Sequence, residues 1–311
     1  MLAERPGKEP APLEGRPLPT AAPRGDWRAV DWRTHQRWET VGGHPVNTIQ
    51  LGAGPALVFV HGLSGSWPNW LEQLAAFAPE HRVLALDLPG FGHSPGRAGE
   101  ISMHGYAELL DELLAQLGLD EATLVGNSMG GLIAAETAAS FPARVRRLVL
   151  VSPAGISTFR NRLTLRTMPA VRRFQQGLAL GAAWTASHAD RLASRPRLRD
   201  AILKGVVAHP SRLYGPLAAE QLRGAGTDGF LEALEEILEF DLRPRLELIS
   251  CPTLIVWGKK DRLITWRDAA RFREGIAGSR EIVYEDTGHM AMLERPEEFN
   301  ALLRGFIAGP Q

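Results

Sequence analysis

The sequence predicts an α/β protein with a mostly parallel central sheet of about eight strands, helices flanking both faces and an inserted helical cap domain. From residue 27 onward, short apolar runs alternate with longer helical patterns. Such alternation is typical of a parallel sheet covered on both faces. The alternation stops between residues 156 and 245, where only helical patterns remain. This interruption indicates an insertion between two strands of the sheet.

Hydrophobic patterning gives the expected elements in order. The runs from Leu57 onward are brief and apolar throughout, as expected for strands buried on both faces. Longer stretches with apolar residues at helical spacing separate them. The expected strands are 37–40, 45–51, 57–60, 83–86, 123–125, 147–151, 253–257 and 281–284. The expected core helices are 70–77, 103–117, 130–140, 267–276 and 296–307.

Composition and patterning divide the chain into four regions. Residues 1–26 are rich in Pro, Gly, Ala and Arg and are expected to form a flexible tail. Residues 27–155 and 246–311 form the two parts of the sheet domain. Residues 156–245, called the cap segment below, form the helical cap. Arginines are frequent in its first half, and we interpret them either as a solvated helical face or as a lid that faces an anion or an anionic lipid.

The overall composition excludes some classes of partner. Lys and Arg total 35 and Asp and Glu total 35, so the formal net charge is zero and we expect no nucleic-acid partner. Cys251 is the only cysteine, which excludes an internal disulfide and a cysteine-based metal cluster. No apolar stretch approaches the roughly 18 residues that span a bilayer, and the N-terminus lacks a signal-like apolar core. We therefore expect a cytoplasmic protein with no integral membrane segment, metal or cofactor.

Ser128 lies between two glycines where a short expected strand meets an alanine-rich helix. A sharp strand-to-helix turn crowds the backbone, and glycine at positions 126 and 130 removes side chains that would collide. The serine at the apex is then exposed beside a helix N-terminus, whose N–H groups favour negative charge. This G-x-S-x-G arrangement predicts that Ser128 is a nucleophile. A structural turn with an incidental serine is the alternative interpretation.

A serine nucleophile needs a base and a group that orients the base. His289 follows the last expected strand, and Asp261 follows the strand before it. Because the carboxyl ends of parallel strands share one edge of the sheet, we expect these groups to meet Ser128 there. His289 is therefore the expected base and Asp261 the expected acid. His93 also lies in a loop at this edge, but no acid is placed to orient it, and Asp87 is expected to hold a neighbouring turn.

The loop His61-Gly-Leu-Ser-Gly65 also follows an expected strand. Small residues leave its backbone N–H groups free to point at a developing negative charge. We expect the backbone N–H groups of Leu63 and Met129 to form an oxyanion hole beside Ser128. A plain turn at the end of the strand is the alternative interpretation of this loop.

Together these motifs resemble the α/β-hydrolase fold family over nearly the whole chain after the tail. The order nucleophile, acid, histidine is that of the family, and the cap segment stands where the family has its cap domain. The resemblance implies the same roles for Ser128, Asp261, His289, Leu63 and Met129. It is carried by HGLSG (61–65), DLPGFGHS (87–94), GNSMGG (126–131), LIVWGKKD (254–261) and TGHMAMLERPEEF (287–299).

A serine at the elbow favours acyl transfer to water, because family members that dehalogenate or open epoxides use an aspartate there. We therefore expect a hydrolase of small-molecule carboxylic esters with small to medium acyl chains. The alternative is a carbon–carbon bond hydrolase of vinylogous diketones, a class that often carries GNSMGG. That class has a Gly-Pro-Gly loop where this chain has residues 63–65, and commonly a tryptophan where it has Met290.

Further alternatives use the same residues. Lipase, thioesterase and acyltransferase activities all proceed through the same nucleophile, and a catalytically silent binding protein would need a broken triad. Substrate choice depends on the lining of the pocket, which the sequence indicates only through bulky apolar residues near the site and in the cap segment. The expected pocket residues are Trp67, Trp70, Phe159, Met168, Phe174, Trp184, Leu263 and Met290.

Overall fold

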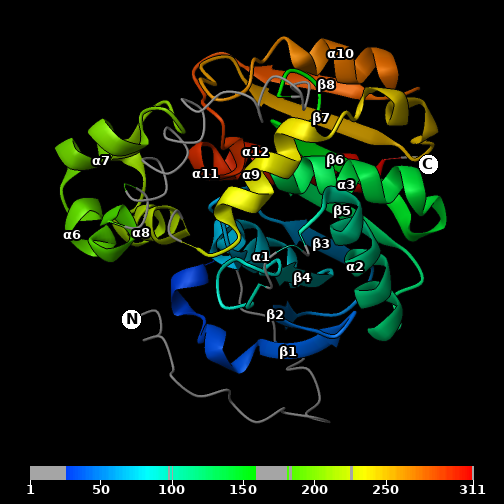
Figure 1. Cartoon of the computed structure of the whole chain (residues 1–311), viewed down its shortest axis with the longest axis horizontal. Helices are drawn as coiled ribbons and strands as arrows, with labels where there is room; N and C mark the ends of the chain where they lie inside the picture. The colour runs from blue at the N-terminus through cyan, green and yellow to red at the C-terminus, as the bar shows by residue number, and fades with distance from the viewer. Residues whose placement is uncertain are drawn as a thin grey trace.

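The computed structural model contains one eight-stranded sheet with helices on both sides (Figure 1). It describes residues 26–96, 99, 101–158, 181, 184–224 and 227–309. The strands are β1 (Gln36–Val41), β2 (His44–Leu51), β3 (Ala56–Val60), β4 (Arg82–Leu86), β5 (Ala122–Asn127), β6 (Val145–Val151), β7 (Thr253–Gly258) and β8 (Arg280–Tyr284). The helices outside the cap segment are α1 (Leu71–Phe77), α2 (Met103–Gln116), α3 (Met129–Ser140), α10 (Asp268–Gly275), α11 (Ala291–Glu294) and α12 (Pro296–Ala308).

The strands lie in the order β1-β2-β4-β3-β5-β6-β7-β8. β2 pairs with β1 and with β4 in antiparallel fashion. All the pairs from β4 across to β8 are parallel. The mostly parallel α/β sheet predicted from the sequence is therefore confirmed. Its parallel strands bring their carboxyl ends to one edge, where the loops that carry the candidate site begin.

Alternate residues of the central strands are buried on opposite faces of the sheet. In β3, Val58 and Val60 pack in the apolar cluster that includes α2 and α3. Leu57 and Phe59 pack in the cluster that includes α1 and α12. All four side chains have 0% exposure. Burial on both faces explains why this strand is apolar at every position rather than at every second one.

β8 departs from this pattern. Its residues are half-buried or exposed, and Ile282 is 38% exposed. The expectation that the strand at 281–284 is buried on both faces is therefore wrong. The physical reason is its place at the edge of the sheet, where only β7 pairs with it and the flanking helices cover it incompletely.

In its described residues the cap segment contains helices and no strand. Helices α6 (Ala189–Ala193), α7 (Pro196–Leu203) and α8 (Gly215–Arg223) form a lobe beside the sheet (Figure 1). Helix α9 (Phe230–Glu239) instead packs on the core, where Ala233 and Ile237 join the cluster of α2 and α3. The boundaries of the cap at 156 and 245 stay a prediction. Short 3-10 helices complete the fold at 27–29, 32–34, 67–70, 142–144, 210–212 and 243–248.

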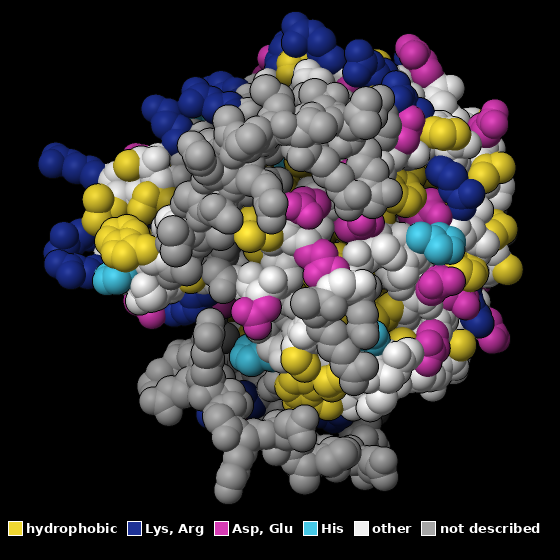
Figure 2. Space-filling view, viewed as in Figure 1, with side chains coloured by type: hydrophobic (Ala, Val, Ile, Leu, Met, Phe, Trp, Pro, Cys, Tyr) yellow, Lys and Arg dark blue, Asp and Glu magenta, His cyan; other side chains and the backbone are white. Residues whose placement is uncertain are grey.

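Lys and Arg side chains gather on the outer side of this lobe, next to hydrophobic ones (Figure 2). Arg191, Arg195 and Arg197 are exposed. Arg199 differs, because its buried guanidinium donates to the carbonyl oxygens of Ala193 and Ser211 at 2.8 and 3.0 Å. Most of these arginines thus lie on a solvated face, while Arg199 cross-links the helices of the lobe.

Candidate active site

Ser128 is the one residue between the end of β5 and the start of α3. Its φ of 56° lies in the left-handed region, which costs a non-glycine residue roughly 1–3 kcal/mol. Three backbone hydrogen bonds hold it there: its N–H donates to Val151 O at 3.0 Å, and its carbonyl accepts from Leu132 N at 3.0 Å and from Ala154 N at 3.1 Å. The side chain is half-buried while the residues on either side are buried. Ser128 is therefore the reachable residue of a strained strand-to-helix junction.

The two flanking glycines are required by close backbone approach. A Cβ at Gly126 would lie 2.1 Å from the carbonyl oxygen of Gly130. A Cβ at Gly130 would lie 2.2 Å from Val60 O and 2.5 Å from His61 O, at the end of β3. Neither position has room for a methyl group. The structure thus confirms why glycine flanks the serine on both sides.

The loop after β3 packs against this elbow. A Cβ built at Gly62 would lie 3.1 Å from Ser128 Cβ. The buried His61 ring braces the loop: its Nδ1 is 2.8 Å from Gly62 O, and its Nε2 accepts from Leu88 N at 3.0 Å. Burial lowers the pKa of His61, in keeping with a neutral ring that accepts at Nε2. The loop that contains Leu63 is thereby held beside the nucleophile candidate.

The amide of Met129 opens α3, so its N–H has no acceptor within the helix. Leu63 lies in the turn that the Gly65 N–H closes onto Gly62 O at 2.9 Å. Both amides therefore belong to the two segments that meet at Ser128. Their role as donors to an oxyanion stays a prediction.

His289 and Asp261 form a hydrogen-bonded pair at the same edge. His289 Nδ1 lies 2.7 Å from Asp261 Oδ2, and the side chains are 5% and 0% exposed. Three further donors hold the carboxylate: Trp257 Nε1 at 3.0 Å, Leu263 N at 2.9 Å and Ile264 N at 3.0 Å. With Nδ1 donating to the carboxylate, the proton is on Nδ1 and Nε2 is left as the acceptor.

Asn127 connects the elbow to the histidine loop. Its amide Nδ2 donates to His289 O at 3.1 Å and to Val151 O at 3.0 Å. Asn127 directly precedes Ser128 and is 2% exposed. The structure thus brings the loops of Ser128 and His289 together, although the two residues are far apart in the sequence. Asn127 is part of the GNSMGG motif, but no pattern in the sequence indicates this bridging role.

Asp87 is a second buried carboxylate near the site that sequence reasoning underestimated. It accepts from Trp67 N at 2.8 Å, Asn47 Nδ2 at 2.8 Å and His93 N at 2.9 Å. Burial alone would raise its pKa, but the hydrogen bonds from His93 and from the Trp67 N–H hold the pKa below its ordinary value. Asp87 thus joins strand β2, the 3-10 helix at 67–70 and the turn that contains His93, rather than one neighbouring turn.

The expected pocket residues separate into different environments. Trp70 has 0% exposure and packs on Phe59 with ring centroids 5.1 Å apart, so it belongs to the core, and its expected place in the pocket lining is corrected. Trp67 and Met290 are also buried, at 6% and 5%.

Leu263 is 56% exposed. Trp184, 57% exposed, stacks on the neighbouring His188. Phe159, Met168 and Phe174 lie outside the described residues.

Across the residues that the structure describes, no group of three or more His, Cys, Asp or Glu side chains is arranged to hold a metal ion. Among the helices formed by the same residues, none is long and apolar enough to span a bilayer.

The protein belongs to the α/β-hydrolase fold family and is a hydrolase. The family's sequence model matches residues 55–296, which include the elbow, Asp261 and His289. The chain is 31% identical over 297 residues to the dihydrolipoyllysine-residue acetyltransferase component of the acetoin cleaving system of Cupriavidus necator, covering 92% of this chain and 73% of that one.

Two further relatives are similar over most of their length. The 2-hydroxy-6-oxononadienedioate/2-hydroxy-6-oxononatrienedioate hydrolase of Klebsiella pneumoniae is 32% identical over 265 residues, or 83% of this chain and 85% of that one. Among solved structures, a bacterial membrane phospholipase A superposes with a TM-score of 0.70 at 27% identity, covering 88% of this chain and 85% of that chain.

Proposed function

We propose that this hydrolase cleaves carboxylic esters of small to medium acyl chains through an acyl-enzyme, with Ser128 as nucleophile, His289 as base and Asp261 as the acid that orients the base. One observation supports this most. Asn127, next to Ser128, is hydrogen-bonded to His289, whose ring is bound to Asp261. A hydroxyl, an imidazole and a carboxylate therefore belong to one connected edge of the sheet.

In the proposed reaction, Ser128 Oγ attacks the carbonyl carbon while His289 Nε2 takes the hydroxyl proton. The carbonyl oxygen becomes an oxyanion, to which the N–H groups of Leu63 and Met129 donate. The bond to the alcohol oxygen then breaks, and His289 returns the proton to that oxygen. In the second half, His289 takes a proton from a water whose oxygen attacks the acyl carbon. The bond from that carbon to Ser128 Oγ then breaks, His289 returns the proton to Oγ, and the acid is released.

Asp261 supports this cycle in two ways. By accepting a hydrogen bond from Nδ1, it keeps the His289 ring in the tautomer whose Nε2 can accept a proton. Its negative charge also stabilises the imidazolium that forms in each half-reaction. Trp257, Leu263 and Ile264 hold the carboxylate in place, so the base does not have to reorient during turnover.

The test is the hydrolysis of p-nitrophenyl esters of increasing acyl length. Ser128→Ala is expected to lower kcat by roughly 10³-fold or more, because residual catalysis then comes from binding and the oxyanion donors alone. Ser152→Ala is the matched control: this serine directly follows β6, also has a positive φ of 46°, and has 0% exposure. Its turnover should stay near the wild-type value. A Ser128→Ala variant with undiminished turnover rules the proposal out.

A second candidate is hydrolysis of a carbon–carbon bond in vinylogous diketones. It is favoured by the 32% identity to the Klebsiella pneumoniae protein, which is named as a hydrolase of two 2-hydroxy-6-oxo dienedioate and trienedioate compounds. The loop at 63–65 and Met290 disfavour this candidate. Carbon–carbon bond hydrolases of this kind have Gly-Pro-Gly at the loop and commonly a tryptophan at the position of Met290. Loss of the dienone absorbance on mixing with the protein, and its absence with Ser128→Ala, would favour this candidate over the ester hydrolase.

Acyl transfer to an alcohol or thiol would use the same acyl-enzyme, with another acceptor in place of water. The Cupriavidus necator relative is named as an acetyltransferase component, and the similar solved structure as a phospholipase A. Adding an alcohol to the ester assay and measuring the ratio of new ester to free acid separates transfer from hydrolysis.

A further inference from the structure

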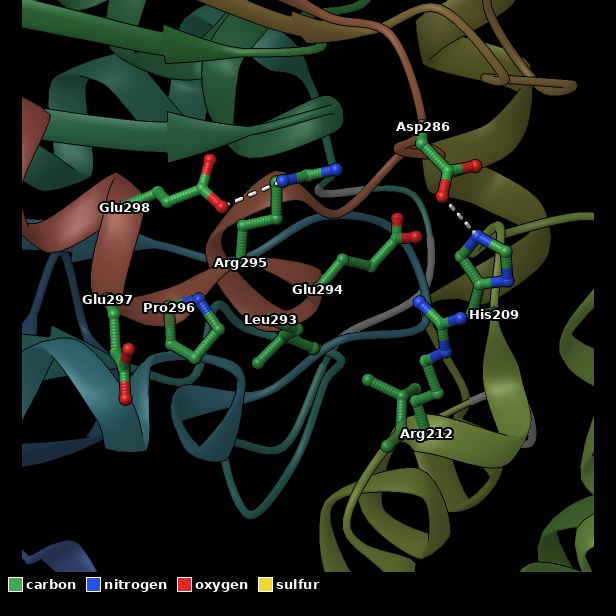
Figure 3. A pocket seen from close by; sticks show the side chains of 10 residues that line it. His209, Arg212, Asp286, Leu293, Glu294, Arg295, Pro296, Glu297 and Glu298 are labelled. Atoms are coloured by element: carbon green, nitrogen blue, oxygen red, sulfur yellow. Dashed lines mark hydrogen bonds and ion pairs between the residues drawn. The ribbon is translucent and has the colours of Figure 1, made fainter.

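The cap segment contacts the histidine loop directly, through backbone atoms. Val206 O accepts from the N–H of His289 at 2.8 Å. Three residues further, His209 Nε2 lies 2.8 Å from Asp286 Oδ2, at the other end of the same loop (Figure 3). The cap segment between 206 and 209 therefore runs along the loop that carries the proposed base.

Glu294 fastens these two segments to each other. Its Oε2 accepts from Ala208 N of the cap segment at 2.7 Å, and its Oε1 accepts from Gly288 N at 2.8 Å. One carboxylate thus binds the residue before His289 and a residue of the cap segment at the same time. Burial raises the pKa of Glu294, although backbone N–H groups that donate to the carboxylate act in the opposite direction.

The packing between the segments is too close for a side chain. A Cβ at Gly288 would lie 2.7 Å from Ala208 N and 2.9 Å from both Val206 O and Glu294 Oε1. At Gly288 the histidine loop therefore has no room for a side chain between the cap segment and Glu294. Any movement of residues 206–208 acts on the backbone of Gly288 and His289.

We propose that Glu294 is a positioning residue for His289, and that through it the cap segment sets the orientation of the base. The backbone of His289 is bound at its N–H by Val206 and at its carbonyl by Asn127, and Glu294 holds the residue before it. Proton transfer needs the base within hydrogen-bond reach of the serine, and a displacement of about 1 Å costs up to roughly 10²-fold in rate. The inference rests on the proposed function, in which His289 is the base.

The variant Glu294→Gln tests it, because its side-chain amide keeps one oxygen acceptor and turns an N–H₂ donor toward the other backbone N–H. We expect kcat for p-nitrophenyl esters to fall about 10-fold with KM changed less than threefold, and Glu294→Ala to fall further, about 10²-fold. Each kcat is divided by the fraction of Ser128 labelled by a fluorophosphonate at completion, so that misfolded protein does not count. A purely structural role would lower the labelled fraction and leave kcat per labelled serine unchanged.

Glu297→Gln is the matched control. Glu294 and Glu297 both line a cavity of about 360 Å³ between the cap segment and the histidine loop. Glu297 lies at the start of α12, is exposed, and points away from Glu294 (Figure 3). Its kcat should equal that of the wild type. If Glu294→Gln fails to fold, Glu294→Asp, whose carboxylate is too short to reach both amides, is measured in the same way.

The outcomes separate this inference from the proposed function. Wild-type kcat per labelled serine in Glu294→Gln, together with an inactive Ser128→Ala, overturns the role of Glu294 and leaves the ester hydrolase standing. Full turnover in Ser128→Ala overturns the proposed function and this inference with it. Equal losses in Glu294→Gln and Glu297→Gln also overturn the role, because they would reflect surface charge rather than the two hydrogen bonds.

Discussion

The Ser128 elbow and the His289 loop meet at one edge of the sheet, yet they are held in different ways. At the elbow, the obstacles around the flanking glycines come from α3 and from the end of β3, both parts of the buried core. The His289 loop is bound by four separate segments: Asn127 at the end of β5, Val206 in the cap segment, Asp261 after β7 and Glu294 in α11. The first is an arrangement within the core, and the second is shared between core and cap.

We therefore expect mutations in the two regions to have different effects on stability and on catalysis. A change at the elbow has to displace sheet backbone, so it should affect the stability of the whole protein. A change at the histidine loop can be absorbed by movement of residues 206–209, so it should affect catalysis more than stability. Glycine-to-alanine variants at the elbow and at the histidine loop test this expected difference between core and cap.

Gly130→Ala should destabilise the fold by about 3 kcal/mol or more, because the new methyl group meets two backbone carbonyl oxygens that cannot move without disturbing β3. The helical Gly305 of α12 is the matched control, since nothing lies within 4 Å of its Cβ position. Gly305→Ala should raise the stability by about 0.5–1 kcal/mol. Urea unfolding curves measure both. A Gly130→Ala protein as stable as the wild type would mean that the elbow is not rigid.

Gly288→Ala should lower kcat/KM by roughly 10-fold with a smaller loss of stability, about 1–2 kcal/mol, because two of the three obstacles are backbone atoms of the cap segment and the third is the end of the Glu294 side chain, all of which can shift. Gly205→Ala is its control. Gly205 directly precedes residues 206–209, which contact the histidine loop, and nothing lies within 4 Å of its Cβ position. Steady-state kinetics and unfolding curves of both variants are compared. A stability loss equal to that of Gly130→Ala would contradict the distinction between core and cap.

Asp286→Asn should have the smallest effect, lowering the melting temperature by about 1–2 °C at pH 6, because the carboxylate is exposed. The hydrogen bond from Lys260, and then that from His209, lower the pKa of Asp286 from 3.8 to about 2. A lowered carboxylate pKa contributes stability above pH 3.8, and this contribution is lost as the pH falls toward 2. The difference between wild type and Asp286→Asn should therefore shrink from pH 6 to pH 2.5 in thermal unfolding scans. A difference that grows in acid would contradict this sign.

Most of the sheet and its order of elements were predictable from the sequence. The mostly apolar runs of β3, β5 and β7 match the expected positions because both faces of those strands are buried. The edge strand β8 differs: Arg280 and Glu281 precede its apolar residues, and its place at the edge of the sheet leaves Ile282 exposed. Trp70 is a residue that was expected at the surface of the pocket and that packs in the core against Phe59 instead.

The elbow was predictable from local sequence, because the glycines that the sharp turn needs lie within two positions of Ser128. How His289 is held follows instead from contacts between distant segments. Its partners Asn127 and Val206 are 162 and 83 positions away, and the Glu294–Ala208 bond spans 86 positions. Contacts between such distant segments depend on how the sheet and the cap pack together, which no local pattern of residues records.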